Sequence, residues 1–264
     1  EGRRIIALEH ATVNSSTLQD TIEQFVANYQ LQNCQTICIL HPSDYHLFQM
    51  DSPAVPEKEM RSALGWQIKD RIRYPVDQAA VDYFPCHGGG SNKIFVVASR
   101  KEMILRVQGL ILGAGLNLVK VTITELSMMR LMLGLTEKKR VAMLSFLAQS
   151  GLFLLLDGPN LVEVKKFPGL VQAKGSNVGE QIDKINGELK RILGSTLAQR
   201  HLEVEELLLI PSVHFDLKDS VRLGKGLPCA IKSINCDKFF LDAKAPDIAV
   251  CANSIAVWGE VLYA

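Results

Sequence analysis

Histidine, cysteine and serine are the residues of this sequence whose types and spacing could support chemistry. Cys86-His87 is the only adjacent pair of soft metal ligands, and the remaining histidines lack the H-x-x-x-H spacing of a metal-binding helix. Because a structural metal site needs several converging ligands, we predict no bound metal. The sequence also lacks the G-x-S-x-G elbow that positions a nucleophilic serine, so nothing in it favours nucleophilic catalysis.

Two glycine-rich stretches, Gly88-Gly89-Gly90 and Gly224-Lys225-Gly226, could suggest phosphate binding. A phosphate-binding loop stands between a strand and a helix, and neither stretch has that setting. We therefore predict ordinary loops. The six cysteines contain no C-x-x-C pair, and we predict reduced thiols for all of them: Cys34, Cys38, Cys86, Cys229, Cys236 and Cys251.

The overall charge is nearly balanced, with 29 Lys and Arg against 28 Asp and Glu in 264 residues. Such a balance gives no reason to expect nucleic acid or an anionic membrane surface as a partner. The longest uncharged run, 141–156, is shorter than the roughly 20 residues of a membrane helix, and two buried strands fit it better. The first residues lack an initiator methionine and an apolar signal region, so we expect no signal peptide and a fragment of a longer protein.

Hydrophobic periodicity predicts alternating strands and helices in the first half of the chain. The predicted strands are 4–9, 35–40, 45–50, 79–84, 93–98 and 118–123, and the predicted helices are 17–29, 57–73 and a third ending at Gly113. We expect Tyr74-Pro75 to end the second helix, because the residue before a proline disfavours helical geometry. From 45 to 123 the order is β-α-β-β-α-β, which predicts a small self-contained unit.

The second half is predicted to follow a charged stretch, 137–140, which is our candidate boundary. Segments of capping-box form at 16–19, 99–102 and 122–125 are expected to begin helices, the last of which runs to about Gly134. Strand 141–146 precedes a hairpin around Asp157-Gly158, a strong turn signal between apolar runs. A long helix 178–198, strands 207–210 and 230–234, and a terminal helix 248–262 complete an α/β pattern.

Three stretches of the sequence carry a resemblance to a known family. The most specific is 41–84, and the second runs from Gly115-Leu116 to Glu125-Leu126. The third is the helical segment 187–197. Together they resemble the MSHA pilus biogenesis protein MshI and type IV pilus assembly PilM-like family, which is related to the cytoplasmic domain of the type II secretion protein L. The matching parts of the first stretch are Pro42-Ser43-x-Tyr45, Ala54-Val55-Pro56, Trp66-Gln67-Ile68-Lys69-Asp70 and Tyr74-Pro75-Val76.

This resemblance implies an α/β fold of the actin-like (ribonuclease H-like) type with two lobes. It implies a first lobe at 1–139 that carries an inserted β-α-β-β-α-β subdomain at about 45–123. A second lobe would occupy 140–245, and a C-terminal helix at 246–264 would return to the first lobe. Members of the family begin with two strands joined by a phosphate-facing turn. That hairpin is missing here, so we expect the chain to begin at the third strand.

The resemblance also bears on nucleotide chemistry. Active actin-like ATPases hold phosphate in hairpin turns, with an acidic residue that helps to organise Mg²⁺. The corresponding Asp-x-Gly would fall near Leu144, Ser145 and Phe146, yet no Asp or Glu occurs from 141 to 156. Pro211-Ser212 stands where an adenosine-facing Gly-Gly would follow the strand. We therefore expect a degenerate loop, no catalysis and no cofactor.

Partner binding is the remaining use for such a chain. Trp66 lies in the most specific motif and has two interpretations, a core residue of the small subdomain or part of a groove for a partner. Aromatic residues and arginine are the enriched anchors of interfaces. We therefore take Trp66, Arg71, Arg73 and Tyr74 as candidate partner-binding residues.

By resemblance, the chain is expected to be a non-catalytic cytoplasmic scaffold at the inner face of the bacterial inner membrane. It would serve an MSHA-type type IV pilus by binding the cytoplasmic N-terminal segment of a bitopic PilN-like protein, coupled to a motor ATPase. Two alternatives stay open. One is the cytoplasmic domain of a type II secretion L protein that binds the motor ATPase directly. The other is an active actin-like ATPase or sugar kinase, which would need an intact phosphate loop before Glu1.

Overall fold

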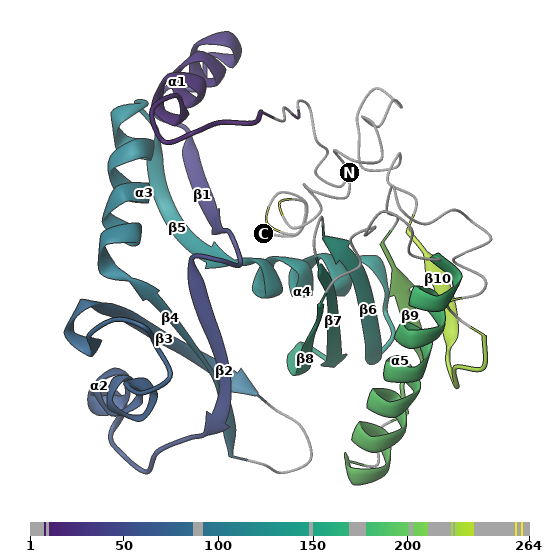
Figure 1. The fold of residues 1–264 in the computed structure, drawn as a ribbon. Helices are drawn as coiled ribbons and strands as arrows, with labels where there is room; N and C mark the ends of the chain where they lie inside the picture. The colour runs from purple at the N-terminus through teal and green to yellow at the C-terminus, as the bar shows by residue number, and fades with distance from the viewer. Residues whose placement is uncertain are drawn as a thin grey trace. The chain divides into compact units, whose positions relative to one another are not determined.

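The computed structural model describes most of the chain, namely residues 8, 11–86, 92–147, 150–168, 178–200, 203–210, 223, 225–234, 257 and 260. The chain divides into two compact units, one formed by 9–86 with 91–126 and the other by 1–8, 87–90 and 127–264 (Figure 1). The division falls within helix α4 (Thr124–Leu135). The lobe boundaries expected from the sequence, 1–139, 140–245 and 246–264, stay a prediction.

The first unit contains two small sheets. A parallel pair is formed by β1 (Gln35–Leu40) and β5 (Asn117–Ile123). Three antiparallel strands stand in the order β2-β4-β3, namely β2 (Tyr45–Asp51), β4 (Lys93–Arg100) and β3 (Ala79–Cys86). The helices are α1 (Leu18–Tyr29), α2 (Glu57–Ile68) and α3 (Lys101–Gly113), with a 3₁₀ turn η1 at Val76–Gln78.

The element order predicted over 45–123 is confirmed, but its last strand pairs elsewhere. Strand β5 lies parallel to β1, from Gln35 opposite Asn117 to Leu40 opposite Ile123. The segment is therefore not self-contained, because β5 belongs to a different sheet from β2, β3 and β4. Local hydrophobic pattern predicts a strand but carries no information about its partner, which explains the difference.

The two faces of the three-stranded sheet are covered by different elements. Successive side chains of a strand point to opposite faces. Val96 and Ala98 therefore face α2, where they form a core with Leu64 and Ile68. Val97 lies on the other face, where α3 and the ends of β1 and β5 contribute a second core. Burying a side chain such as Leu64 stabilises the fold by about 1.5–3 kcal/mol.

Helix α2 ends earlier than the sequence suggested, at Ile68 rather than at 73. Beyond Ile68 the chain turns tightly, with the N–H of Arg71 donating to the carbonyl of Ile68 at 2.8 Å. This turn still buries Ile72 against the α2 core, so the apolar stripe continues without the helix. Pro75 begins the link to η1 with an extended backbone and does not end the helix.

The three predicted capping boxes do not form as expected. The hydroxyl of Thr17 gives no cap to α1, and the Asn14 side chain instead accepts the backbone N–H groups of Ser16 and Thr17, each at 3.0 Å. Ser99 belongs to β4, and its hydroxyl donates to the carbonyl of Asp44 at 2.7 Å. Thr122 lies inside β5. A local contact of Asn14 at the first segment and a long-range contact of Ser99 at the second thus replace the expected caps, and the sequence pattern reveals neither.

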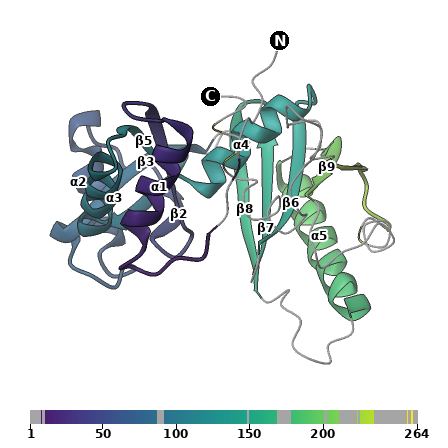
Figure 2. The same cartoon turned by 90° about the horizontal axis from the view of Figure 1, so that it is seen from above.

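The second unit is built around one mixed sheet in the order β10-β9-β6-β7-β8. Figure 2 shows β9, β6, β7 and β8 of this sheet with helix α5. Its predicted hairpin is confirmed, and Gly158 takes the left-handed conformation (φ 57°) in the turn between β7 and β8. The long helix α5 (Val178–Arg200) packs Ile182, Ile185 and Leu189 against the sheet. The strands are β6 (Arg140–Leu147), β7 (Ser150–Asp157), β8 (Asn160–Pro168), β9 (Glu206–Leu209) and β10 (Ala230–Ser233).

Several predicted features lie outside the described residues. They are most of strand 4–9, the glycine stretch 88–90, Pro211-Ser212, Cys236, Cys251 and most of helix 248–262. Of that last helix, Val257 and Glu260 are described, and both are helical. The carboxylate of Glu260 is buried and forms an ion pair with Arg130 of α4 at 3.2 Å.

Candidate functional site

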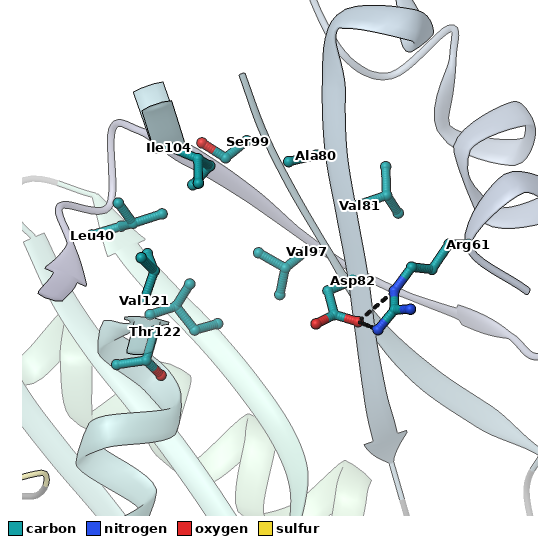
Figure 3. Close-up of a pocket in the computed structure, with 11 residues that line it drawn as sticks. Leu40, Arg61, Ala80, Val81, Asp82, Val97, Ser99, Ile104, Val121 and Thr122 are labelled. Carbon is teal, nitrogen blue, oxygen red and sulfur yellow. Dashed lines mark hydrogen bonds and ion pairs between the residues drawn. The ribbon is translucent and has the colours of Figure 1, made fainter. Parts of the chain in front are cut away.

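A pocket of about 270 Å³ opens in the first unit beside strand β3 (Figure 3). Its walls come from the ends of β1 and β5, from α3 and from the face of β3 and β4 that α2 does not cover. Most of the lining is aliphatic. The lining residues are Leu40, Arg61, Ala80, Val81, Asp82, Val97, Ser99, Ile104, Val121, Thr122 and Ile123.

The few polar groups of the pocket are mostly engaged with the protein itself. The Arg61 guanidinium contacts the carboxylate of Asp82 at 3.1 Å at the edge of the pocket, as Figure 3 shows. Both side chains are 69% exposed, so this ion pair contributes little to stability. The hydroxyl of Ser99 is held by the Asp44 carbonyl. The pocket therefore offers shape and apolar surface, and no converging catalytic groups.

Strand β3 gives this pocket a second feature, an open edge. It is an outer strand of the β2-β4-β3 sheet and pairs only with β4 among the described strands. Three of its residues, Ala80, Val81 and Asp82, also line the pocket. An outer strand presents unpaired backbone N–H and C=O groups, which can pair with an added strand. Pocket and edge together suit an extended peptide.

A buried hydrogen bond stands next to one wall of the pocket. The Tyr45 hydroxyl donates to the carboxylate of Glu125 at 2.5 Å, and both residues are nearly inaccessible to solvent. Tyr45 also packs in one cluster with the pocket residues Leu40 and Ile123. Burial, followed by the negative charge of Glu125, raises the pKa of Tyr45 above its usual range. The bond thus fixes the start of β2 to the start of α4.

The same bond joins two of the stretches that carry the family resemblance. Tyr45 belongs to the first stretch and Glu125 to the second, and 80 positions separate them. Neither residue is assigned a function from the sequence alone. Their occurrence in separate matching motifs is the one signal in the sequence that they could meet in the fold. Their position identifies them as structural supports of the pocket.

The four candidate partner-binding residues lie away from this pocket. Trp66 projects from α2 with 64% of its surface exposed, so its interpretation as a core residue is wrong. Helical spacing could have predicted this exposure, because Trp66 does not lie on the face of α2 that buries Leu64 and Ile68. Arg71 and Arg73 are exposed, and Tyr74 is half-buried in the α2 core. None of the four lines the pocket.

Instead, two of the four belong to a row of stacked aromatic and cationic side chains. The Arg71 guanidinium lies 4.3 Å from the ring centre of Phe48, and Arg100 lies 4.5 Å from that of Tyr74. His46 stands between the two rings, 5.8 Å from Phe48 and 6.2 Å from Tyr74. We call these five residues the arginine–aromatic row. Trp66 makes a separate, weaker contact with Lys69 at 5.7 Å.

The residues expected near a degenerate phosphate loop lie within strand β6. Leu144 pairs with Phe153, Ser145 with Leu152 and Phe146 with Gly151. Leu144 and Ser145 are both fully buried in the sheet. Both side chains therefore belong to the core of the second unit's sheet.

Metal and thiol chemistry receive no support from the described part of the chain. No group of three or more His, Cys, Asp or Glu residues converges there as a metal site would require. Cys34, Cys38, Cys86 and Cys229 are thiols and not members of disulfides. Burial raises the pKa of Cys38 and Cys229, which lowers the share of reactive thiolate. Among the described helices, none has the length and apolar character needed to span a membrane.

Comparison with known proteins identifies the fold. No protein-family model matches the chain, and no curated protein matches its sequence. A chain of the PilM–PilN type IV pilus biogenesis complex matches with 18% identity and a TM-score of 0.69, over 98% of this chain and 87% of that one. A Bacteroides thetaiotaomicron protein with an actin-like ATPase fold and unknown function matches with 10% identity and a TM-score of 0.55, over 97% and 85%.

A further match is the cytoplasmic domain of EpsL, an inner-membrane component of the type II secretion system of Vibrio cholerae. It has 10% identity and a TM-score of 0.49, over 92% of this chain and 79% of that one. The two matches with higher TM-scores show that this chain has the actin-like α/β fold that the sequence resemblance implied.

Proposed function

We propose that this chain is a non-catalytic cytoplasmic scaffold of an MSHA-type type IV pilus, placed at the inner face of the inner membrane. In this role it binds the cytoplasmic N-terminal segment of a bitopic PilN-like protein. The observation that carries the proposal is the aliphatic pocket beside the open edge of β3. The match to a chain of the PilM–PilN complex, whose fold this chain shares, supports the identity of the partner.

The size and lining of the pocket favour a peptide over a small cofactor. Small-molecule sites usually enclose about 300–1,000 Å³ and place several polar groups around the ligand. This pocket encloses about 270 Å³ and is lined mainly by aliphatic residues. It suits an apolar side chain of a peptide whose backbone adds to the β3 edge. The main chain of the peptide then forms hydrogen bonds with β3, and the pocket provides specificity for the apolar side chain.

The assignment of residues follows from this geometry. Ala80, Val97 and Ile104 line the pocket from three different elements, and we assign them to the peptide. Trp66 stands on the outer side of α2, so it provides a matched control within the same unit. This assignment differs from the expectation that Trp66 contacts the same segment, and one experiment separates the two.

The test is a titration of the purified chain with a labelled peptide from the N-terminus of the PilN-like partner. We expect saturable binding in the micromolar range, roughly −8 kcal/mol. Ala80→Leu, which fills the pocket, should weaken binding at least about tenfold, whereas Trp66→Ala should leave it unchanged. Circular dichroism and thermal unfolding verify the fold of each variant. Absence of saturable binding by the unaltered chain would contradict the proposed function. Loss of binding in Trp66→Ala but not in Ala80→Leu would show that the peptide binds at α2 and not at the pocket.

A further inference from the structure

The arginine–aromatic row has the features of a binding surface that the pocket does not use. Its two guanidinium groups lie over aromatic rings, Arg71 at 4.3 Å from the ring centre of Phe48 and Arg100 at 4.5 Å from that of Tyr74. Stacking of this kind restricts the arginine rotamers while the N–H groups at the edge of the guanidinium stay available. The row therefore presents two guanidinium groups, each with parallel N–H donors, on the α2 side of the sheet. We call each set of donors a fork.

These arginines differ from most other arginines whose side chains the structure describes, because they have no acidic partner among the described residues. Arg61 pairs with Asp82, Arg130 with Glu260 and Arg191 with Glu188. Within the described residues, no carboxylate lies in ion-pair distance of Arg71 or Arg100. Arg73, next to the row in sequence, has no such partner there either. The arginines of the row are stacked and oriented, but no acid within that part of the chain neutralises them.

The local charge is positive although the chain as a whole is nearly neutral. The turn after α2 and the end of β4 contribute Lys69, Arg71, Arg73 and Arg100 against the single carboxylate of Asp70. The whole chain has a formal charge of +1. A planar guanidinium matches a carboxylate with two parallel hydrogen bonds, which a flexible ammonium group does not. Charge and geometry thus point to a ligand that carries carboxylates.

We propose that the arginine–aromatic row binds an acidic segment of a partner protein, with carboxylates held by the forks of Arg71 and Arg100. This site is separate from the β3 pocket and does not depend on the pilus assignment. Asp and Glu side chains of one extended segment, spaced along it, can reach both forks. The rings of Phe48 and His46 between the forks supply apolar contact for the segment's backbone and side-chain stems.

A protein segment fits this surface better than an anionic bilayer does. Membrane recognition by charge usually requires four to eight lysines and arginines gathered on one surface. Here α2 also carries the exposed carboxylates of Glu57 and Glu59, and Asp70 follows it in the turn. A flat anionic surface would approach all of these groups at once. A peptide can contact the two forks and avoid the acids.

The experiment uses the purified chain and fluorescein-labelled hexaglutamate as the probe, followed by fluorescence anisotropy at low ionic strength. We expect saturable binding that the double variant Arg71→Glu, Arg100→Glu weakens at least about tenfold. The matched control is Lys58→Glu with Arg106→Glu, which makes the same change of net charge at two exposed helix positions. The control should bind like the unaltered chain. The variant Arg71→Lys, Arg100→Lys should also bind more weakly, because it keeps the charge and loses the forks.

A second readout needs no substitution. In ¹⁵N spectra of the unaltered chain, the Nε–Hε signals of Arg71 and Arg100 should shift on addition of hexaglutamate, and that of Arg106 should not. Absence of saturable binding, or equal weakening in the matched control, would overturn the proposal. Undiminished binding by the lysine variant would overturn the role of the forks. Binding to phosphatidylglycerol vesicles that needs both arginines, without hexaglutamate binding, would replace the protein partner by a membrane.

Discussion

At the scale of single residues, the Tyr45–Glu125 hydrogen bond is the feature with the clearest energetic consequence. Both partners are buried, and the bond has an ionisable acceptor in a region of low polarity. Hydrogen bonds to charged groups contribute about 1.5–3 kcal/mol, more than neutral ones. The bond also lies in the cluster that shapes one wall of the pocket. Its loss should therefore affect both stability and peptide binding.

We predict that Tyr45→Phe lowers the free energy of unfolding by about 1–3 kcal/mol, because the carboxylate of Glu125 loses a buried donor. Urea unfolding followed by circular dichroism measures the change. Tyr83→Phe is the control, since Tyr83 is half-buried and no hydrogen bond joins its hydroxyl to the described residues. A loss as large in the control would argue against a special role of Tyr45.

The raised pKa of Tyr45 predicts a dependence of stability on pH. Tyr45 binds its phenolic proton more strongly in the folded state than in the unfolded state. Its stabilising contribution is therefore complete below the unfolded pKa of about 10 and is lost progressively as the pH rises above that value. Between pH 8 and about 11, the unaltered chain should lose more stability than Tyr45→Phe. Parallel curves for the two proteins would contradict the assignment.

For Trp66 we predict that substitution has little effect on stability. Because most of its surface is exposed, Trp66→Ala should change the free energy of unfolding by less than about 0.5 kcal/mol. Leu64→Ala, only two positions away and fully buried, should cost about 2–5 kcal/mol. Thermal unfolding of both variants measures the contrast. A large loss for Trp66→Ala would restore its interpretation as a core residue.

At the scale of secondary-structure elements, the helices are stabilised mainly by the apolar faces that they bury. Helix α2 buries Leu64 and Ile68 against the three-stranded sheet, and α5 buries Ile182 and Leu189 against the five-stranded sheet. Intrinsic helix propensity is a smaller contribution, and glycines within the helices reduce it. Their substitution is informative because the surrounding space differs from one glycine to the next.

We predict that Gly187→Ala in α5 raises the free energy of unfolding by about 0.5–1 kcal/mol, since nothing lies within 4 Å of the added methyl group. Gly65→Ala in α2 should raise the free energy of unfolding by less than this, or lower it, because the added methyl group would lie 3.1 Å from the side chain of Val76. Urea unfolding of the two variants compares them directly. Equal gains would show that Val76 moves aside at no cost.

At the scale of the whole molecule, the chain has an actin-like fold, but the segment where the resemblance places a phosphate loop carries no acidic residue. Leu144 and Ser145 are fully buried in β6, and no acidic residue occurs from 141 to 156. The two surfaces that we propose for binding belong to the first unit, namely the β3 pocket and the arginine–aromatic row.

We predict that the purified chain does not hydrolyse ATP, because the segment that would organise Mg²⁺ and water lacks a carboxylate. The measurement is phosphate release with Mg²⁺ and ATP, compared with heat-denatured protein. Magnesium-dependent turnover that exceeds this control and co-purifies with the chain would contradict the prediction.

The sequence by itself determined most of the described elements, since a periodicity of two or 3.6 is a local property of the chain. It predicted strands β1 to β9 within a few residues, the Asp157-Gly158 turn and the long helix α5. Strand β10 was also located correctly. These elements follow from which side chains are apolar and from how closely they are spaced.

Only the tertiary structure decided which elements meet. The pairing of β5 with β1, the end of α2 at Ile68, and the bond between Tyr45 and Glu125 all depend on residues far apart in the sequence. The pocket belongs to the same class, because its walls come from five separate elements and from α2 at its edge. Periodicity shows that a face is apolar but not what covers it. That choice is made by the packing free energy of the whole unit, to which every distant contact contributes.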